Sequence, residues 1–410
     1  ESQMSGKWPG GFIKKTAPVV VGPVDGEGGT ASGIWTLDQV ADYEKQGLWP
    51  KPILDKEFYS WGINNAGQLG LNDQTNRSSP VQIGALTTWT TASAGYDFSY
   101  GITDGKLYSW GYGSFGRLGQ GSSTNYSSPV QVGALTTWSQ VAAGYDGALA
   151  IKTDGTLWTL GGRNFYGELG QGNTTTYSSP VQIGSLTNWA QVTASNRFTF
   201  AIKTDGTAWS WGQGGDGVLA QGNTTNYSSP VQIGSLTDWA SIIPGRSSIV
   251  ATKTDGTMWS WGANPYGALG TNVPTSDAVN SPVQIGALTT WSNTSSGQNY
   301  SLATKTDGTL WVWGRGTDGR LGVGNTTNYS SPIQLGALTT WLNVAAGYDG
   351  SLATKTDGTL WSWGKNTDGQ LGLGNTTTYS SPVQVGALTT WNVLAKRPFL
   401  KSAVLATTKS

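Results

Sequence analysis

The sequence predicts an all-β protein, a seven-bladed β-propeller closed by strands from the C-terminus, and three observations support this. A pattern of about 50 residues returns seven times in the same order, and a period of this length is typical of propellers and solenoids. Short alternating strands and hairpin turns fill each copy. The first copy lacks strands that the end of the chain supplies. Since a single repeat cannot bury its own core, the array is expected to fold as one domain.

Each copy is marked by a Trp-Gly pair, followed by a glycine-rich stretch with Leu-Gly and then by Ser-Pro-Val-Gln or a close variant. The third copy has lapsed to Leu-Gly. The pairs begin at Trp61, Trp110, Leu160, Trp211, Trp261, Trp313 and Trp363. One blade is assigned to each copy.

The strands of one unit follow from the alternation of side chains between residues 138 and 161. Trp138 to Ala143 is predicted as one strand and Ala148 to Lys152 as the next. Asp154-Gly155 then closes a hairpin, and we expect both residues of this two-residue turn to adopt positive φ. The same turn recurs at Asp205, Asp255, Asp307 and Asp357, with a variant at Asp104.

Tryptophan supplies the predicted core. Residues two apart on a strand share a face, so Trp361 and Trp363 are expected to point into the same gap between neighbouring blades. A third recurrent tryptophan, for example Trp341, opens the next strand. These three positions hold 18 of the 21 tryptophans. Each buried indole contributes several kcal/mol of gross hydrophobic free energy, roughly 4 to 6 kcal/mol.

The ends of the array predict a closed ring. The first unit starts abruptly at Glu57, without the strand pair that precedes every other Trp-Gly copy. The chain ends with such a pair, because residues 402–407 match residues 350–355. We therefore expect the C-terminal strands to complete the blade that residues 57–62 begin, which removes exposed sheet edges.

Residues 1–54 are predicted to be a separate, mostly irregular extension, and residues 55–410 to be the propeller. Thr36 and Gln39 form a capping box, and Gly47 and Pro50 stop the short helix that follows. If this extension is an anchor, its apolar residues carry the contact. The candidate anchor residues are Trp35, Leu37, Val40 and Trp49. The alternative interpretation is a generic linker helix.

Composition excludes several functions. The 24 basic and 24 acidic residues balance, so no nucleic-acid partner is expected. The chain has neither cysteine nor histidine, which removes the commonest nucleophilic pairs and metal ligands. No long apolar stretch predicts membrane insertion. Three Gly-x-Gly-x-x-Gly stretches, at residues 111–116, 212–217 and 314–319, belong to the repeat and open no helix, so no cofactor is expected.

Candidate binding residues lie where the repeats differ in sequence, because positions that pack in the core need the same kind of residue in every copy. The turn after the first strand of each unit varies, and its register places these residues on one face of the ring. The candidates for this partner-binding face are Tyr96, Tyr145, Arg197, Arg246, Asn299, Tyr348 and Arg397. A second set follows the Trp-Gly pair: Phe115, Phe165, Tyr166 and Tyr266. Exposed aromatic and arginine side chains suit a protein or glycan surface. Drift of solvated loops is the alternative.

The combined motif resembles a known repeat. W-G-x-x-x-x-G-x-L-G, S-P-V, the Ala-Gly turn and T-D-G-x-L-W together are similar to the regulator of chromosome condensation repeat, a seven-bladed β-propeller. The resemblance covers nearly all of the chain after residue 54 and implies that fold. The founding activity, nucleotide exchange on the GTPase Ran with chromatin binding, is not implied. The family's Ala-Gly-x-x-His turn has no histidine at the matching positions Phe98, Gly147, Phe198, Ser248, Tyr300, Gly350 and Phe399.

A second resemblance covers about 20 residues of the extension. Gly33-Ile34-Trp35-Thr36-Leu37 to Ala41, followed by Gly47 to Pro50, is similar to a segment of marine bacteriophage structural proteins. It implies a virion protein that displays the propeller on the capsid or tail, as decoration or for attachment. Its partners would be other virion proteins through residues 1–54 and a host-surface protein or glycan.

Two other functions compete with the virion hypothesis. One is a cytoplasmic, cellular propeller that acts as a protein-interaction module or GTPase regulator. The other is an enzyme, which is not expected, because no acidic pair stands outside the repeat to replace the missing histidine and cysteine.

Overall fold

A computed structural model describes residues 56–274, 277–394 and 402–408 of the chain. Contacts divide the chain into two units, Glu1–Leu54 and Asp55–Ser410, and the described residues all belong to the second. The predicted helix lies outside the described residues, and so do the four candidate anchor residues, Trp35, Leu37, Val40 and Trp49.

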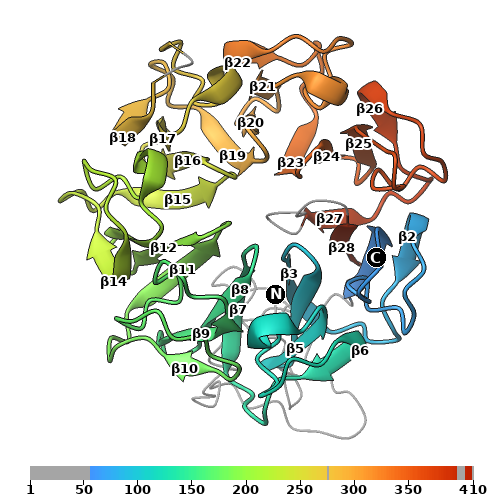
Figure 1. Cartoon of the computed structure of the whole chain (residues 1–410). Coiled ribbons are helices and arrows are strands. Elements are labelled where there is room, and N and C mark those ends of the chain that lie inside the picture. Colours follow the sequence, from blue (N-terminus) through green and yellow to red (C-terminus); the bar gives the residue numbers. More distant parts are fainter. Residues whose placement is uncertain (1–55, 275–276, 395–401, 409–410) are drawn as a thin grey trace, which may run out of the picture. The chain divides into compact units, whose positions relative to one another are not determined.

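The described unit is built from short antiparallel strands arranged in a ring (Figure 1). Six blades are named here in chain order. Blade I contains β3 (Trp89–Ala94), β4 (Phe98–Thr103), β5 (Lys106–Gly111) and β6 (Tyr126–Gln131); blade II β7 (Trp138–Ala143), β8 (Gly147–Lys152), β9 (Leu157–Gly162) and β10 (Val181–Gln182); blade III β11 (Trp189–Ala194), β12 (Phe198–Lys203), β13 (Ala208–Gly212) and β14 (Tyr227–Gln232). Blade IV contains β15 (Trp239–Pro244), β16 (Ser248–Lys253), β17 (Met258–Gly262) and β18 (Val279–Gln284); blade V β19 (Trp291–Ser296), β20 (Tyr300–Lys305), β21 (Leu310–Gly314) and β22 (Tyr329–Gln334); blade VI β23 (Trp341–Ala346), β24 (Gly350–Lys355), β25 (Leu360–Gly364) and β26 (Tyr379–Gln384).

The predicted count of seven blades needs a correction. Six blades are each made by one continuous stretch of chain, with four strands in sequence order. The remaining four-stranded sheet is composite. It has the order β2-β1-β28-β27, with β1 (Lys56–Gly62), β2 (Arg77–Gln82), β27 (Trp391–Leu394) and β28 (Ser402–Thr408). We call it the closing sheet.

The closing sheet joins the two ends of the array, as their sequences predicted. Strand β1 pairs with β28 in antiparallel register from Lys56↔Thr408 to Gly62↔Ser402. On one side β28 packs against β3 of blade I, and on the other β27 packs against β23 of blade VI. In Figure 1 the blue and red strands therefore meet, and the ring has no open edge in the described residues.

Helices are nearly absent from the described residues. They contain only single 3-10 turns: η1 (Ser114–Gly116), η2 (Gly215–Gly217), η3 (Pro265–Gly267) and η4 (Thr317–Gly319). Each follows a Trp-Gly pair, and its central residue has positive φ, for example Phe115 at 61°. Three of these turns lie in the Gly-x-Gly-x-x-Gly stretches. No α-helix begins there, so these stretches lack the helix N-terminus that binds a dinucleotide phosphate.

The hairpin turns differ from the prediction in one respect. Only the glycine of most Thr-Asp-Gly-Thr turns has positive φ, as at Gly155 (76°), and the aspartate does not. The reason is local hydrogen bonding. The Asp154 carboxylate accepts bonds from the amide and the hydroxyl of Thr156, at 2.9 and 2.6 Å, and Gly155 N–H reaches Lys152 O. Only the variant Asp104-Gly105 turn has positive φ at both residues.

The tryptophan of the Trp-Gly pair links neighbouring blades. In blade VI the indole N–H of Trp363 donates to the carbonyl of Arg320 in blade V, at 3.0 Å. Five other copies make the same bond to the preceding unit, at 2.8 to 3.1 Å. All six indoles are fully buried: Trp61, Trp110, Trp211, Trp261, Trp313 and Trp363. We call this contact the indole link.

The lapsed copy in blade II lacks the indole link, and the carbonyl that would accept it is paired within blade I instead. Leu160 is buried but cannot donate a hydrogen bond. The carbonyl that an indole would reach, Arg117 O, instead accepts a 2.6 Å bond from the hydroxyl of Tyr100 on β4. Burial raises the pKa of this phenol well above its usual value, so it remains a donor. A buried acceptor therefore stays paired although the tryptophan is gone.

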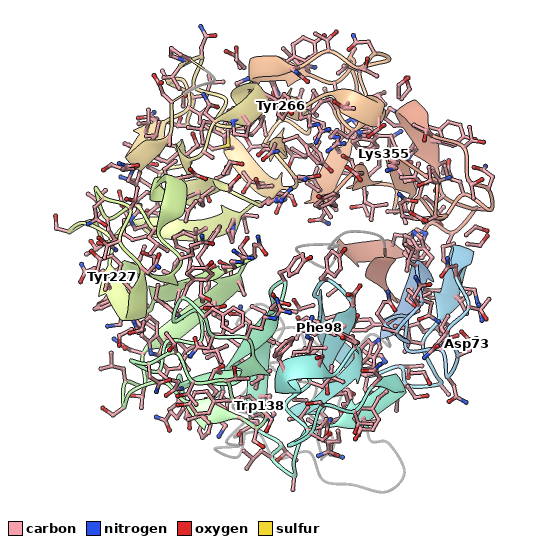
Figure 2. The ribbon with its side chains drawn as sticks, viewed as in Figure 1. Asp73, Phe98, Trp138, Tyr227, Tyr266 and Lys355 are labelled. Atoms are coloured by element: carbon pink, nitrogen blue, oxygen red, sulfur yellow. The ribbon has the colours of Figure 1, made fainter. Side chains whose placement is uncertain are left out.

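The third recurrent tryptophan packs inside each blade. Trp341 meets Trp361 and Trp363 edge to face, with ring centroids 6.2 Å away in both cases, so the two indoles of β25 share a face as predicted. Lys355, labelled in Figure 2, lies across this cluster, with Nζ 3.7 Å from the Trp361 centroid. The same lysine arrangement recurs at Lys152, Lys203, Lys253 and Lys305.

The turns between the first and second strands of the blades, which we call the inner turns, bring the blades close together at the ring centre. The first strands of consecutive blades, β3, β7, β11, β15, β19 and β23, pack against one another. A Cβ added at Gly144 would lie 2.4 Å from the carbonyl oxygen of Ser195, and one at Gly297 would lie 2.2 Å from that of Gly347. Glycine is therefore required at these turns by the approach of the next blade. Ser195 replaces it once, and its hydroxyl donates to Gly245 O at 2.6 Å.

One prediction concerns the glycine that touches each indole link. Gly270 (φ 70°) leaves no room for a Cβ, which would lie 2.7 Å from Nε1 of Trp313. Blade III carries Ala220 at the equivalent position, with φ 57°. Ala220→Gly should raise the free energy of unfolding by about 0.5 to 1 kcal/mol, because it relieves a left-handed alanine. Gly270→Ala should lower it by more than about 1 kcal/mol. Chemical denaturation measures both, and a loss of stability in Ala220→Gly would contradict this explanation.

A second prediction concerns acid. Hydrogen bonds from the threonine hydroxyl and amide lower the pKa of Asp154, Asp205, Asp255, Asp307 and Asp357 below the usual value of 3.8. Their stabilising effect is complete above that value and is lost as the pH falls through the lowered pKa. The free energy of unfolding should therefore fall below pH 4. A variant with asparagine at all five positions should show a shallower fall, and an unchanged pH profile would show that these turns contribute nothing.

Candidate functional site

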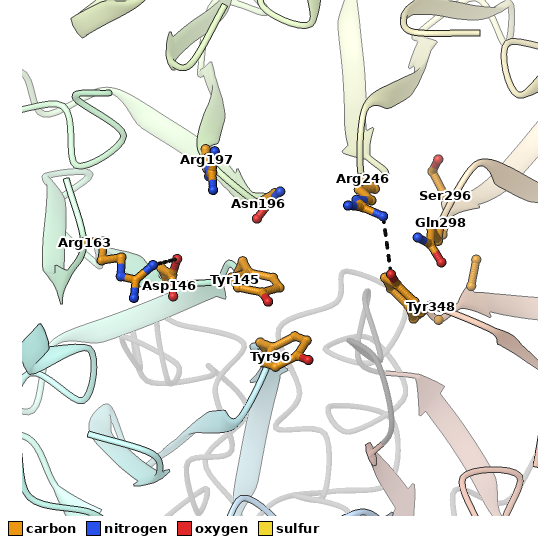
Figure 3. Close-up of a pocket in the computed structure, with 13 residues that line it drawn as sticks. Tyr96, Tyr145, Asp146, Arg163, Asn196, Arg197, Arg246, Ser296, Gln298 and Tyr348 are labelled. Atoms are coloured by element: carbon orange, nitrogen blue, oxygen red, sulfur yellow. Dashed lines mark hydrogen bonds and ion pairs between the residues drawn. The ribbon is translucent and has the colours of Figure 1, made fainter. Parts of the chain in front are cut away.

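The variable inner turns line a cavity at the centre of the ring (Figure 3). These turns follow the first strand of each blade, which places their side chains at one end of the central strands. The cavity has a volume of about 270 Å³. Its principal side chains are Tyr96, Tyr145, Asp146, Arg163, Asn196, Arg197, Arg246, Gln298 and Tyr348. We call it the central cavity.

Two tyrosines form an aromatic wall of the central cavity. The rings of Tyr96 in blade I and Tyr145 in blade II lie 4.3 Å apart between centroids, tilted by 36°. Burial, together with the neighbouring Tyr96, raises the pKa of Tyr145 to about 12, so the Tyr145 phenol is neutral at physiological pH. The two tyrosines offer flat apolar faces and hydroxyl groups to a ligand.

Two arginines of the central cavity are held by phenols. Arg246 is exposed, and its guanidinium donates to the hydroxyl of Tyr348 at 3.3 Å, from blade IV to blade VI across the ring (Figure 3). Arg197 donates to the hydroxyl of Tyr166 at 3.2 Å and lies 5.2 Å from that ring. No ion pair among the described residues includes Arg197 or Arg246. Both guanidinium groups therefore retain donors for a partner.

Among the described residues that line the central cavity, one carboxylate is found, that of Asp146, and it is already paired. Asp146 is buried, and its two oxygens lie 3.0 Å from Arg117 and 3.6 Å from Arg163. Asp349 in blade VI has the equivalent arrangement, with Arg320 at 2.8 Å and Lys365 at 3.9 Å. Buried ion pairs of this kind fix the geometry of a site more than they stabilise a fold.

A second cavity of about 300 Å³ adjoins the first. Asn196 and Arg246 line both cavities, so Arg246 lies between them. The second cavity also contains Asp216 and Asn299. The Asn299 side chain is 9% exposed, and its Oδ1 has no hydrogen-bond partner among the described residues.

The predicted partner-binding face is largely brought together by the fold. Tyr96, Tyr145, Arg197, Arg246 and Tyr348 line the central cavity, and Asn299 lines the second cavity. Arg397 lies outside the described residues.

The second predicted set lies around this face. Phe115 and Phe165 stack near Arg163, with its Cζ 4.2 and 5.6 Å from their centroids. Tyr166 holds Arg197, as described above. Tyr266 pairs with Arg315, outside both cavities, at 5.2 Å.

Sequence reasoning missed two side chains of the central cavity, Arg163 and Ser296. Asp146, Asn196 and Gln298 also line it; they lie in the variable turns from which the candidates came, but the candidate set took only one residue from each turn. Arg163 follows the lapsed Leu-Gly copy, at a position that is Gln213 in blade III and Ala263 in blade IV.

The described residues contain no group of three or more acidic residues arranged to hold a metal ion. None of their helices is long and apolar enough to cross a membrane. The chemistry that this face offers consists of aromatic faces, amides and guanidinium donors.

Solved structures similar to this chain share its fold. Human WBSCR16 is 19% identical, with a TM-score of 0.76, and the match covers 86% of this chain and 99% of WBSCR16. A chain from the structure of Kap60 bound to yeast RCC1 (Prp20) is 19% identical, with a TM-score of 0.78 and coverage of 87% and 90%. Prp20p of Saccharomyces cerevisiae, from a study of its binding to Gsp1p and histones, is 19% identical with a TM-score of 0.76. That match covers 87% of this chain and 92% of Prp20p.

No curated protein matches the chain in sequence. None of the relatives named above is a phage protein, and the family matches begin at residue 57, after the segment that carried the phage hypothesis.

Family models match most of the described chain. Regulator of chromosome condensation (RCC1) repeats match residues 57–102 and 104–151. The model of the RCC1-like domain matches residues 129–397, more than half of the chain, and the chain therefore belongs to the RCC1-like domain family.

Proposed function

We propose that this chain is a cellular protein-interaction propeller that binds its partner at the face of the central cavity. The observation that carries the proposal is the gathering of tyrosine, arginine and amide side chains from all six blades around one cavity. Tyrosine and arginine dominate the energetic centres of protein interfaces.

The cavity side chains are free of the packing constraint that fixes the rest of the repeat. The first variable turn position is Tyr96, Tyr145, Asn196, Arg246, Gln298 or Tyr348 in blades I to VI, while the glycine or serine before it is held by contact with the next blade. The backbone of this face is thus rigid, and its side chains are free to suit a partner. Rigid, aromatic-rich surfaces lose little conformational entropy on binding.

The structural relatives are consistent with a protein partner. One was solved bound to Kap60, and Prp20p was studied for binding to Gsp1p and histones. At 19% identity this chain shares their fold, and its own inner turns carry none of the histidines expected of the family repeat. The proposal is therefore for protein binding, with no GTPase assigned.

Binding rather than catalysis is proposed for the cavity because its only carboxylate, Asp146, is held in two ion pairs. A general base needs an available carboxylate or imidazole near the substrate.

Site-specific cross-linking in the native host tests this proposal. Tyr348 is replaced by the photoreactive residue benzoylphenylalanine, which keeps an aromatic ring in the cavity. We expect irradiation to cross-link a specific partner protein, identified by mass spectrometry. The matched control carries the same residue at Leu338, which is 50% exposed in the loop before β23, at the other end of that strand. No cross-link from Tyr348, or the same cross-links from both positions, would overturn the proposal.

A further inference from the structure

The charge of the central cavity is unbalanced. Three guanidinium groups, those of Arg163, Arg197 and Arg246, line it with a single carboxylate, Asp146. Asp146 is committed to Arg117 and Arg163. The described side chains that line the cavity therefore carry more positive than negative charge, although the chain as a whole has a formal net charge of zero and Asp97 lies within electrostatic reach of Tyr145.

Arg246 is the cation best placed to meet a ligand. It is exposed, lines both cavities, and donates a hydrogen bond to the hydroxyl of Tyr348. A phenol orients a guanidinium without neutralising it.

Arg197 is more constrained than Arg246. The buried Glu168 lies within its electrostatic reach, although Glu168 is not within ion-pair distance and instead accepts the N–H of Tyr166 at 2.8 Å. Figure 3 shows the amide of Asn196 between Arg197 and Arg246, and the amide of Gln298 beside Arg246 and Tyr348.

Resting on the function proposed above, we infer that the central cavity receives a carboxylate of the partner protein, bound by Arg246 and Arg197 beside the Tyr96–Tyr145 wall. Guanidinium groups bind carboxylates through paired, charge-assisted hydrogen bonds. A cavity of about 270 Å³ accommodates one or two side chains rather than a folded element. The expected ligand is therefore an acidic peptide segment that places the carboxylate of an aspartate, of a glutamate or of its own C-terminus in the cavity.

Calorimetric titration of the full chain with short peptides tests the inference. The probes are a glutamate-containing peptide blocked at both ends, its glutamine counterpart, and the glutamine peptide with a free C-terminus. Binding of the first points to a side-chain carboxylate, and binding of the third alone points to a terminal one. Affinity should fall as salt is added. Equal binding of the blocked glutamine peptide, or no binding of either carboxylate peptide, would overturn the inference.

Three single variants test whether the carboxylate binds at Arg246 and Arg197. Arg246→Gln and Arg197→Gln should each weaken carboxylate binding by roughly tenfold or more. Arg315→Gln removes one positive charge beside Tyr266, outside both cavities, and should change affinity by less than about twofold. Equal losses in all three would show a diffuse charge effect and contradict the site. If Tyr348 cross-links a partner equally in the Arg246→Gln variant, the proposed function survives and the carboxylate site does not.

Discussion

The ring depends on one repeated contact, the hydrogen bond from a buried indole to a main-chain carbonyl of the preceding unit. The indole contributes a large buried apolar surface, and its N–H satisfies a carbonyl that the ring shields from water. The glycine beside it lies at positive φ, where a Cβ would collide with the indole. Trp-Gly and Leu-Gly recur together because a unit supplies the glycine that packs on its successor's tryptophan, and Ala220 replaces this glycine in blade III. Where Leu160 replaces the tryptophan, the matching carbonyl, Arg117 O, is still paired, but its donor is Tyr100 of the same blade, so this hydrogen bond does not cross between blades.

This constraint separates structure from function along the chain. The tryptophans, the glycines of the inner turns and the aspartates of the hairpins are all accounted for by packing and turn geometry. The side chains at the tips of the inner turns are not, and they gather in the central cavity. Because the backbone beneath them is fixed by contacts between blades, a change at Arg246 or Tyr348 would change the lining of the cavity without altering the fold. A repeat protein of this kind can change partner while keeping its scaffold.

Much of this was predictable from the sequence, for physical reasons. The strands at Trp138–Ala143 and Gly147–Lys152 follow from period-two alternation, and the pairing of β1 with β28 follows from the matching ends of the array. The register of the inner turns placed Tyr96, Tyr145 and Tyr348 at one cavity, because equivalent positions in a ring face the same way. The hairpin aspartates were assigned the wrong φ, because side-chain capping by Thr156 favours a different turn. The count of seven blades was corrected to six continuous blades and a composite closing sheet.

Some side-chain contacts could not be predicted from the sequence. No local pattern shows that Tyr100 replaces a missing indole, or that Arg117 reaches Asp146 from a neighbouring blade. These contacts depend on side-chain reach across the gap between blades, which repeat spacing does not encode.

The central claim is that indole links between blades hold the ring together. Trp363 and Trp361 lie two residues apart on β25, but only Trp363 reaches the neighbouring blade, since the N–H of Trp361 bonds to Thr359 in its own hairpin. Chemical denaturation of Trp363→Phe and Trp361→Phe compares them directly. The account predicts a loss of about 2 to 4 kcal/mol for Trp363→Phe, from the cavity and from the lost hydrogen bond to the Arg320 carbonyl, which keeps only the Ser351 hydroxyl as a donor. For Trp361→Phe it predicts a loss of about 1 kcal/mol. Equal losses, or a larger loss in Trp361→Phe, would contradict it.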